Sequence, residues 1–187
     1  MLKKKIMGLR GMPDILPDET DKWQYAENAA RMLFEKYGYK EIRTPILEET
    51  ALFKRGIGEE TDIVQKQMYS FIDRGERDIA LRPEGTAPIA RSYLENGLDK
   101  RFPLCQLYYI GPMFRSERPQ AGRNRQFYQI GAEAMGVEDP KLDAEIIAML
   151  SKILESIGLT GLNFEVTSIG CKECRPDYRE ALKNFLR

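Results

Sequence analysis

Two β-rich stretches on either side of an arginine-rich turn constrain the fold of this chain more than any other feature. PLCQLYYIGPMFR (103–115) and QFYQIGAEAMG (126–136) are rich in β-forming residues and predict two long strands. Between them, residues 116–124 include Pro119 and Gly122, which favour a turn. The sequence therefore predicts two long strands around a polar loop.

Four arginines gather at this loop: Arg115, Arg118, Arg123 and Arg125. The planar guanidinium group suits multidentate binding of phosphate, and several on one loop suit a polyphosphate better than a single carboxylate. Glu117 could offset repulsion within the cluster, accept from the amino group of a base, or help hold Mg²⁺, and the sequence does not choose among these roles. The alternative interpretation is a solvated, charge-rich turn with no ligand.

The second strand separates its side chains onto two faces, because successive residues of a strand point to opposite sides. One predicted face is core, and consists of Tyr128, Ile130, Ala132 and Ala134. The other combines a ring, an amide, a gap and a carboxylate, and consists of Phe127, Gln129, Gly131 and Glu133. This second face indicates a polar ligand, with a half-exposed strand as the alternative.

A further polar group lies in LRPEGT (81–86), where a predicted strand turns into a predicted helix. The carboxylate of Glu84 and the hydroxyl of Thr86 could receive an ammonium group there. A purely structural interpretation is that Thr86 caps the helix while Glu84 lies near its positive end.

Elsewhere the periodicity predicts further elements. We expect a helix that Asp18 caps and that Gly38 ends. A short strand over KEIRTPIL (40–47) is expected to end near Pro45. A β-hairpin is expected to join QMYSFID (67–73) to RDIALRP (77–83). Downstream we expect helices from Thr86 to Glu95, through the apolar positions from Leu142 to Leu154, and from about Pro176, with a strand over LNFEVTSIG (162–170) before the last.

Composition excludes several kinds of function. The chain has no histidine, which removes every histidine nucleophile pair, general base and metal ligand. Lys plus Arg total 29 and Asp plus Glu also total 29, so the chain has no net positive charge of the kind that indicates a nucleic-acid-binding protein. No apolar run is long enough to span a membrane, and three cysteines suit a reducing compartment, so we expect a cytoplasmic protein.

Two short motifs carry less weight. Cys171 and Cys174 could form half of a four-cysteine zinc site, but no second pair is present, so the expectation is a buried or merely free thiol pair and no metal site. Neither a dinucleotide fingerprint nor a GxxxxGK[ST] loop occurs, so a nucleotide would be held by arginines on a sheet.

Four segments together resemble the histidyl-tRNA synthetase family of class II aminoacyl-tRNA synthetases. They are GLRGMPDILPDE (8–19), RTPILEET (43–50), LRPEGTAPIAR (81–91) and YIGPMFRSERPQAGRNRQFYQIGAE (109–133). The resemblance runs along essentially the whole chain and implies an α+β fold, an antiparallel β-sheet flanked by helices. It also implies that residues 1–187 are an N-terminal portion of the catalytic domain, with class II motifs 1 and 2 but without motif 3 or the anticodon-binding domain, so that the sheet is incomplete.

The resemblance also implies roles for individual residues. Arg115 would be the catalytic residue and would bind the α-phosphate of ATP. Glu117 would contact the adenine amino group, and Arg123 would reach the far phosphates. Phe127 would stack on the adenine ring. Glu84 and Thr86 would hold the amino group of histidine. The amino-acid pocket would also include Gln129 and Glu133, and Pro45 would lie at a dimer interface. Tyr128 departs from the family by standing where many relatives have histidine.

The implied reaction is the activation of histidine by ATP, with Mg²⁺, and transfer of the histidyl group to the 3′ end of histidine tRNA by a cytoplasmic homodimer. The main rival is the regulatory subunit of ATP phosphoribosyltransferase, a histidine-sensing binding protein that lacks aminoacylation and typically loses the arginines that grip ATP. Another class II synthetase, or a nucleic-acid-binding module without catalysis, are weaker alternatives.

Overall fold

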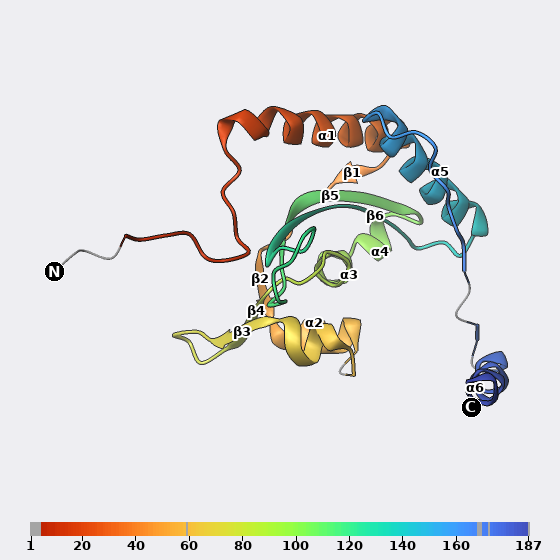
Figure 1. The fold of residues 1–187 in the computed structure, drawn as a ribbon. Coiled ribbons are helices and arrows are strands. Elements are labelled where there is room, and N and C mark those ends of the chain that lie inside the picture. Colours follow the sequence, from red (N-terminus) through yellow and green to blue (C-terminus); the bar gives the residue numbers. More distant parts are fainter. Residues whose placement is uncertain (1–4, 59, 168–169, 172, 187) are drawn as a thin grey trace.

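The structure is a computed structural model, which describes residues 5–58, 60–167, 170–171 and 173–186. Its centre is a curved sheet with strand order β1-β5-β6, whose two long strands β5 and β6 are green in Figure 1. The strands β5 (Cys105–Phe114) and β6 (Gln126–Met135) pair antiparallel along their whole length, from Cys105 opposite Met135 to Phe114 opposite Gln126. The short strand β1 (Lys40–Glu41) runs parallel to β5. The predicted pair of long strands is confirmed.

A second, smaller sheet has the order β2-β4-β3 and is antiparallel throughout. It consists of β2 (Leu47–Glu49), β3 (Tyr69–Ile72) and β4 (Asp78–Leu81). The hairpin between β3 and β4 is the predicted one, and Asp73 closes its turn by accepting from the amides of Gly75 and Arg77 at 2.8 and 2.9 Å.

Two helices cover one face of the central sheet, α1 (Pro17–Lys36) and α5 (Pro140–Ser156). Between the helices and the sheet lies a core that includes Phe34, Tyr39, Tyr108, Met149 and Ile153. The rings of Phe34 and Tyr108 stack with centroids 4.7 Å apart. Large buried rings of this kind contribute much of the stability of a core, so this pair anchors α1 to the sheet.

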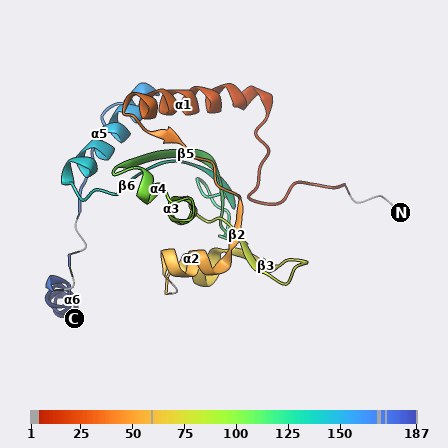
Figure 2. The same cartoon turned by 180° about the vertical axis from the view of Figure 1, so that it is seen from behind.

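The opposite face of the central sheet carries α3 (Thr86–Glu95) and the short α4 (Leu98–Arg101), as Figure 2 shows from behind. Ile89 of α3 packs there against Cys105 and Leu107 of β5. The small sheet has its own helix, α2 (Thr50–Ile57), followed by a π-helical turn over Ile63–Gln67. The helix α6 (Cys174–Phe185) has no buried residue and stands apart from the rest of the molecule (Figure 1).

Several predicted boundaries were wrong. Asp18 does not cap α1, which begins at Pro17 after Leu16 without a side-chain cap, whereas Gly38 follows the helix with φ of 86° as expected. The predicted strand 40–47 is divided, because the chain leaves the central sheet after Ile42 and joins the small sheet at Ile46. Pro45 lies between the two strands.

One further prediction, at the C-terminal end, needs correction. Residues 162–167 form no strand, because none of the strands in the described part of the chain pairs with them. Residues 168–169 of that predicted strand lie outside the described residues. The helix expected from about Pro176 is present as α6, which begins at Cys174 with Pro176 in its first turn.

The predicted core face of β6 is only partly buried. Ala132 packs against the core between the sheet and α1, but Tyr128 and Ile130 remain 37% and 41% exposed. Tyr128 meets Trp23 of α1 edge to face at 4.9 Å. Ile130 lines an apolar groove of about 390 Å³ that α1 and α5 leave open. Among the described residues, no helix is both long and apolar enough to cross a membrane.

Candidate functional site

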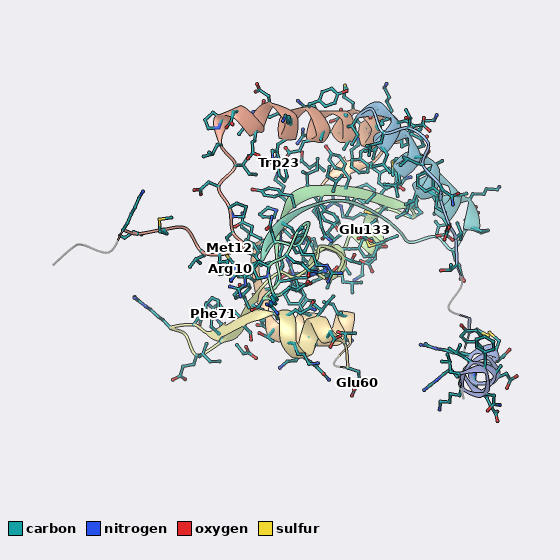
Figure 3. The ribbon with its side chains drawn as sticks, in the orientation of Figure 1. Arg10, Met12, Trp23, Glu60, Phe71 and Glu133 are labelled. Atoms are coloured by element: carbon teal, nitrogen blue, oxygen red, sulfur yellow. The ribbon has the colours of Figure 1, made fainter. Side chains whose placement is uncertain are left out.

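The polar face of β6 turns away from α1 and α5, toward the side of the sheet that carries α3. Strand pairing places Phe127 opposite Met113, Gln129 opposite Gly111 and Glu133 opposite Leu107. Paired residues of antiparallel strands point to the same face, so the four predicted ligand-facing positions of β6 do share one face. Figure 3 shows Glu133 at the end of the strand near α4, and Arg10 and Met12 near the opposite, loop end.

A polar cluster forms where LRPEGT meets this face. The Thr86 hydroxyl donates to Oε1 of Glu133 at 2.8 Å, although the two residues are far apart in sequence. The carboxylate of Glu84 accepts from the backbone N–H groups of Thr86 and Ala87 at 2.6 and 2.9 Å. The Glu84 carboxylate, rather than the Thr86 hydroxyl, thus satisfies the first N–H groups of α3, and Gly85 is the N-cap residue.

The electrostatics of this cluster favour a cationic ligand. Burial raises the pKa of the Glu133 carboxyl, the Thr86 hydroxyl opposes this effect, and the charge of Glu84 raises the pKa further. Neither carboxylate forms an ion pair with a cationic side chain within the described part of the chain. An ammonium group placed between them would therefore remove repulsion and gain two charged acceptors.

Tyr109, which no sequence motif singled out, fills the gap expected at Gly131. A Cβ atom on Gly131 would lie 2.4 Å from Cζ of Tyr109, and one on Gly85 would lie 2.3 Å from the same ring. Burial, followed by the charges of Glu133 and Glu84, raises the pKa of Tyr109 to about 12, so its phenol is neutral at physiological pH. The signal in the sequence was the pair of glycines, since a bulky neighbour is one reason for glycine within a strand.

Gln129 contributes an unmatched acceptor on the same face. Its Oε1 atom is buried and has no hydrogen-bond partner among the described residues. A buried amide oxygen without a partner costs free energy, and the cost disappears if a ligand supplies an N–H or O–H group. Gln129 therefore fits the predicted role of a pocket residue.

Arg115 lies between the polar cluster and the loop. Its Nε atom donates to the carbonyl of Pro83 at 2.9 Å, and its guanidinium lies 5.0 Å from the centroid of the Phe127 ring. Its backbone N–H donates to the carbonyl of Arg125 at 2.8 Å, which closes the base of the loop. Arg115 and Phe127, both predicted to contact ATP, are thus brought together beside the segment that holds Glu84.

The rest of the loop is fastened by its own residues and by the N-terminal segment. Arg123 pairs with the Glu117 carboxylate at 3.4 Å, so in this structure Glu117 offsets the positive charge of the loop. The carbonyl of Gly11 accepts from the backbone N–H groups of Arg125 and Gln126 at 2.7 and 3.1 Å. Arg123 keeps 65% of its side chain exposed, so its guanidinium is accessible to an anion.

Arg82 is a second residue that no sequence motif singled out. Its side chain is buried and donates to the carbonyls of Pro112 and Thr44, both at 3.0 Å, and to the Thr44 hydroxyl at 3.2 Å. Its own carbonyl accepts from the N–H of Phe114 at 2.9 Å. Arg82 therefore holds the LRPEGT segment against β5, and burial lowers the pKa of its guanidinium.

Pro45 lies outside this cluster, next to the small sheet. Large apolar side chains on that sheet and beside it are exposed, namely Ile46, Leu47, Phe71 and Ile72. Figure 3 shows Phe71 on the outer hairpin, well away from Glu133. An exposed apolar patch of this kind is typical of a protein–protein contact.

Comparison with known proteins places these features in context. The Histidyl-tRNA synthetase family profile matches residues 11–173. A histidine–tRNA ligase of Geobacter metallireducens is 57% identical over 182 residues, which cover 97% of this chain. The crystal structure of apo S. aureus histidyl-tRNA synthetase superimposes with a TM-score of 0.77 at 45% identity, covering 95% of this chain and 41% of that one.

A more distant structural match bears on the alternative function. A Bacillus halodurans protein, described as an ATP phosphoribosyltransferase regulatory subunit/histidyl-tRNA synthetase, superimposes with a TM-score of 0.70 at 28% identity and covers 86% of this chain and 39% of that one. This chain spans 44% of the length of its Geobacter relative. The α+β fold expected from the sequence is confirmed by the structural match to the S. aureus protein.

Proposed function

Because this chain belongs to the histidyl-tRNA synthetase family, we propose that it forms the part of a histidine–tRNA ligase that binds histidine and ATP. Residues 1–187 would be an N-terminal portion of the class II catalytic domain, containing motifs 1 and 2. The observation that carries the proposal is the convergence of Glu84, Thr86 and Glu133 beside Arg115 on one face of the sheet.

The polar cluster would hold the amino acid. Glu84 and Thr86 would receive the ammonium group of histidine, since a carboxylate and a hydroxyl oxygen are suitable acceptors for it. Gln129 and Glu133 would line the rest of the amino-acid pocket, where the unmatched Oε1 of Gln129 would accept a hydrogen bond from the substrate. Tyr109, neutral and half-buried beside Glu133, would form the floor of this pocket.

Arg115 would then act on the reacting phosphate. The carboxylate of histidine attacks the α-phosphorus of ATP in the proposed reaction, so no protein nucleophile or general base is required, which agrees with the absence of histidine from the chain. Arg115 would stabilise negative charge that develops on the α-phosphoryl oxygens, a task suited to a fixed guanidinium. The Pro83 carbonyl holds that guanidinium in place.

The loop would supply the remaining contacts with ATP. Arg123 would exchange Glu117 for the far phosphates, which would free the Glu117 carboxylate to approach the adenine amino group. Phe127 would stack on adenine, sharing its ring with the Arg115 guanidinium that already lies over it. The loop contacts would therefore rearrange when ATP binds.

Mg²⁺ would enter as part of the nucleotide substrate. No group of three or more His, Cys, Asp or Glu residues suited to a metal ion occurs in the described part of the chain. Mg²⁺ is commonly held by substrate phosphates together with one or two carboxylates and several waters. When bound, the ion would neutralise charge on the phosphates.

Further elements of the proposal concern partners. The 3′ end of histidine tRNA would receive the histidyl group, and the full-length protein would act in the cytoplasm as a homodimer. Pro45 and the exposed apolar side chains beside the small sheet support a dimer contact there. The alternative, a histidine-sensing regulatory subunit, is less well supported. Relatives named histidine–tRNA ligase reach 57% identity, against 28% for the structure whose description mentions a regulatory subunit, and both Arg115 and Arg123 are present.

The test is release of pyrophosphate from ATP by this chain with Mg²⁺, measured separately with each of the twenty amino acids. The expected result is release that depends on histidine. Binding of histidine and of ATP is measured in parallel by calorimetry. Histidine binding without ATP binding would favour the regulatory alternative, and binding of neither would contradict the proposed site.

Replacing Arg115 tests the assigned role directly. Arg115→Ala is expected to slow adenylate formation by roughly 10²- to 10³-fold, because a charged contact to the developing oxyanion is lost. Arg118→Ala is the matched control, since Arg118 is an exposed arginine of the same loop with no role in the proposed reaction. Equal rates in the two variants, with both folded by circular dichroism, would remove Arg115 from the mechanism.

A further inference from the structure

The proposed function leaves one reactive group unused, the pair of thiols at the start of α6. Cys171 and Cys174 are both exposed, and their sulfur atoms lie 3.6 Å apart. The backbone N–H of Cys171 donates to Sγ of Cys174 at 3.1 Å. The two sulfurs are therefore close enough to interact and accessible to a reagent in solution.

We propose that Cys171 and Cys174 form a redox-active dithiol that closes reversibly to a disulfide, with Cys171 as the attacking thiol and Cys174 as the resolving thiol. A disulfide requires a sulfur–sulfur distance of about 2.05 Å, so the two atoms must approach by about 1.5 Å. Because neither side chain is held in a packed core, rotation about their side-chain bonds suffices.

The electrostatic environment at the helix start supports this division of roles. Backbone N–H groups of Cys174 and Glu173, and then the Cys174 thiol, lower the pKa of Cys171 by stabilising its thiolate. The Cys174 thiol lies 3.8 Å from the backbone carbonyl oxygen of Cys171, which is an acceptor for its proton. The thiolate is the nucleophile in thiol–disulfide exchange, so Cys171 reacts first.

The oxidant is the disulfide of a small thiol, such as glutathione disulfide. The Cys171 thiolate attacks one sulfur of that disulfide, which forms a mixed disulfide and releases one thiolate that takes up the proton lost by Cys171. Cys174, once deprotonated, attacks Sγ of Cys171 and releases the second thiol. Two protein thiols and one small disulfide thus become one protein disulfide and two small thiols, with two electrons transferred.

A metal site is the competing interpretation of two close sulfurs. Tetrahedral zinc is held by four ligands. In the described part of the chain, no third ligand, whether histidine, cysteine or a carboxylate, joins Cys171 and Cys174 in a group that could hold a metal ion. Redox chemistry, by contrast, needs only the two thiols that are present.

The third cysteine is an internal control. Cys105 is buried in β5, and burial raises the pKa of its thiol. A buried thiol is protonated and shielded from reagents, so Cys105 is expected to stay reduced under conditions that oxidise the pair.

The experiment exposes the freshly reduced chain to glutathione disulfide at neutral pH, blocks remaining thiols with N-ethylmaleimide, and maps the products by peptide mass spectrometry. We expect a Cys171–Cys174 disulfide that dithiothreitol reverses, with Cys105 unmodified until the protein is denatured. The wild-type Cys171 should react at least about tenfold faster than Cys105. Cys174→Ser should accumulate glutathione on Cys171, whereas Cys171→Ser should slow the reaction at position 174.

Three outcomes would overturn the proposal. Cys171 and Cys174 could stay reduced, each could retain its own glutathione without closing, or elemental analysis could find a stoichiometric metal ion that binds both sulfurs and blocks oxidation. None of these results depends on histidine activation, so failure here and failure of the proposed ligase activity are distinguishable. Both serine variants change exposed side chains and leave the sheet and its core intact.

Discussion

The contact between Gly131 and Tyr109 provides a quantitative test of how the site is built. Gly131→Ala would place a methyl group 2.4 Å from Cζ and 2.5 Å from both Cε1 and Oη of Tyr109. Ordinary van der Waals contact begins at 3.4 Å, so the ring must move by about 1 Å or the strands must separate. Gly85 is equally close to the ring, so the ring cannot move toward that backbone.

The expected cost follows from overpacking. Inserting a methyl group into a close-packed site costs about 1–3 kcal/mol, and alanine otherwise suits a strand better than glycine by about 0.5–1 kcal/mol. Gly131→Ala should therefore lower the free energy of unfolding by about 1–2 kcal/mol. If the ring moves, Gly131→Ala should also weaken histidine binding, because Tyr109 lies against Glu133 and Thr86.

A double-mutant cycle isolates the contact. In a Tyr109→Ala background the ring is gone, so Gly131→Ala should cost nothing or stabilise slightly, giving a coupling of about 1–3 kcal/mol. Gly8→Ala is the control, since a Cβ atom at Gly8 meets nothing within 4 Å. Urea unfolding monitored by circular dichroism supplies the free energies. Additive effects of the two substitutions would refute the argument that these glycines exist to accommodate Tyr109.

Two other predictions concern charged groups. Arg82→Met should lower the free energy of unfolding by about 2–4 kcal/mol, because the carbonyl groups of Pro112 and Thr44 lose their hydrogen-bond donor. Arg118→Met is the control and should change the free energy of unfolding by less than about 0.5 kcal/mol, with both values measured by urea unfolding. Burial raises the pKa of Glu133 above its ordinary 4.5, so the folded protein binds that proton more tightly than the unfolded chain and loses stability as the pH rises through this range. Glu133→Gln cannot ionise and should be more stable than the wild type at neutral pH, with the difference vanishing below about pH 4.5; a constant difference across the titration would contradict this.

The features predicted correctly depend on local pattern. The alternation in β6 assigned Gln129 and Glu133 to one face, and the turn residues near Asp73 and Gly75 marked the hairpin, because strand periodicity and turn chemistry act over a few residues. The clustering of Glu84, Thr86 and Glu133 came from the family resemblance and not from any such pattern.

The features missed depend on residues that are distant in sequence. The occupancy of the Gly131 gap by Tyr109 depends on the register of β5 and β6, which periodicity alone does not fix. Ile42 and Ile46 belong to two different sheets, a division that requires knowledge of their partners. The exposure of Ile130 follows from the angle at which α1 and α5 meet the sheet, and no local pattern specifies it.

The hydrogen bonds of Arg82 imply an order of events as the chain folds. Its partners lie 30 and 38 residues away in sequence, so these contacts form only after large loops have closed. The β5–β6 hairpin, whose strands are joined by a short loop, needs no such closure and can form earlier. We therefore expect the arginines proposed to bind ATP to be arrayed on the hairpin before LRPEGT docks against it, so the proposed amino-acid pocket would be completed after the proposed nucleotide site.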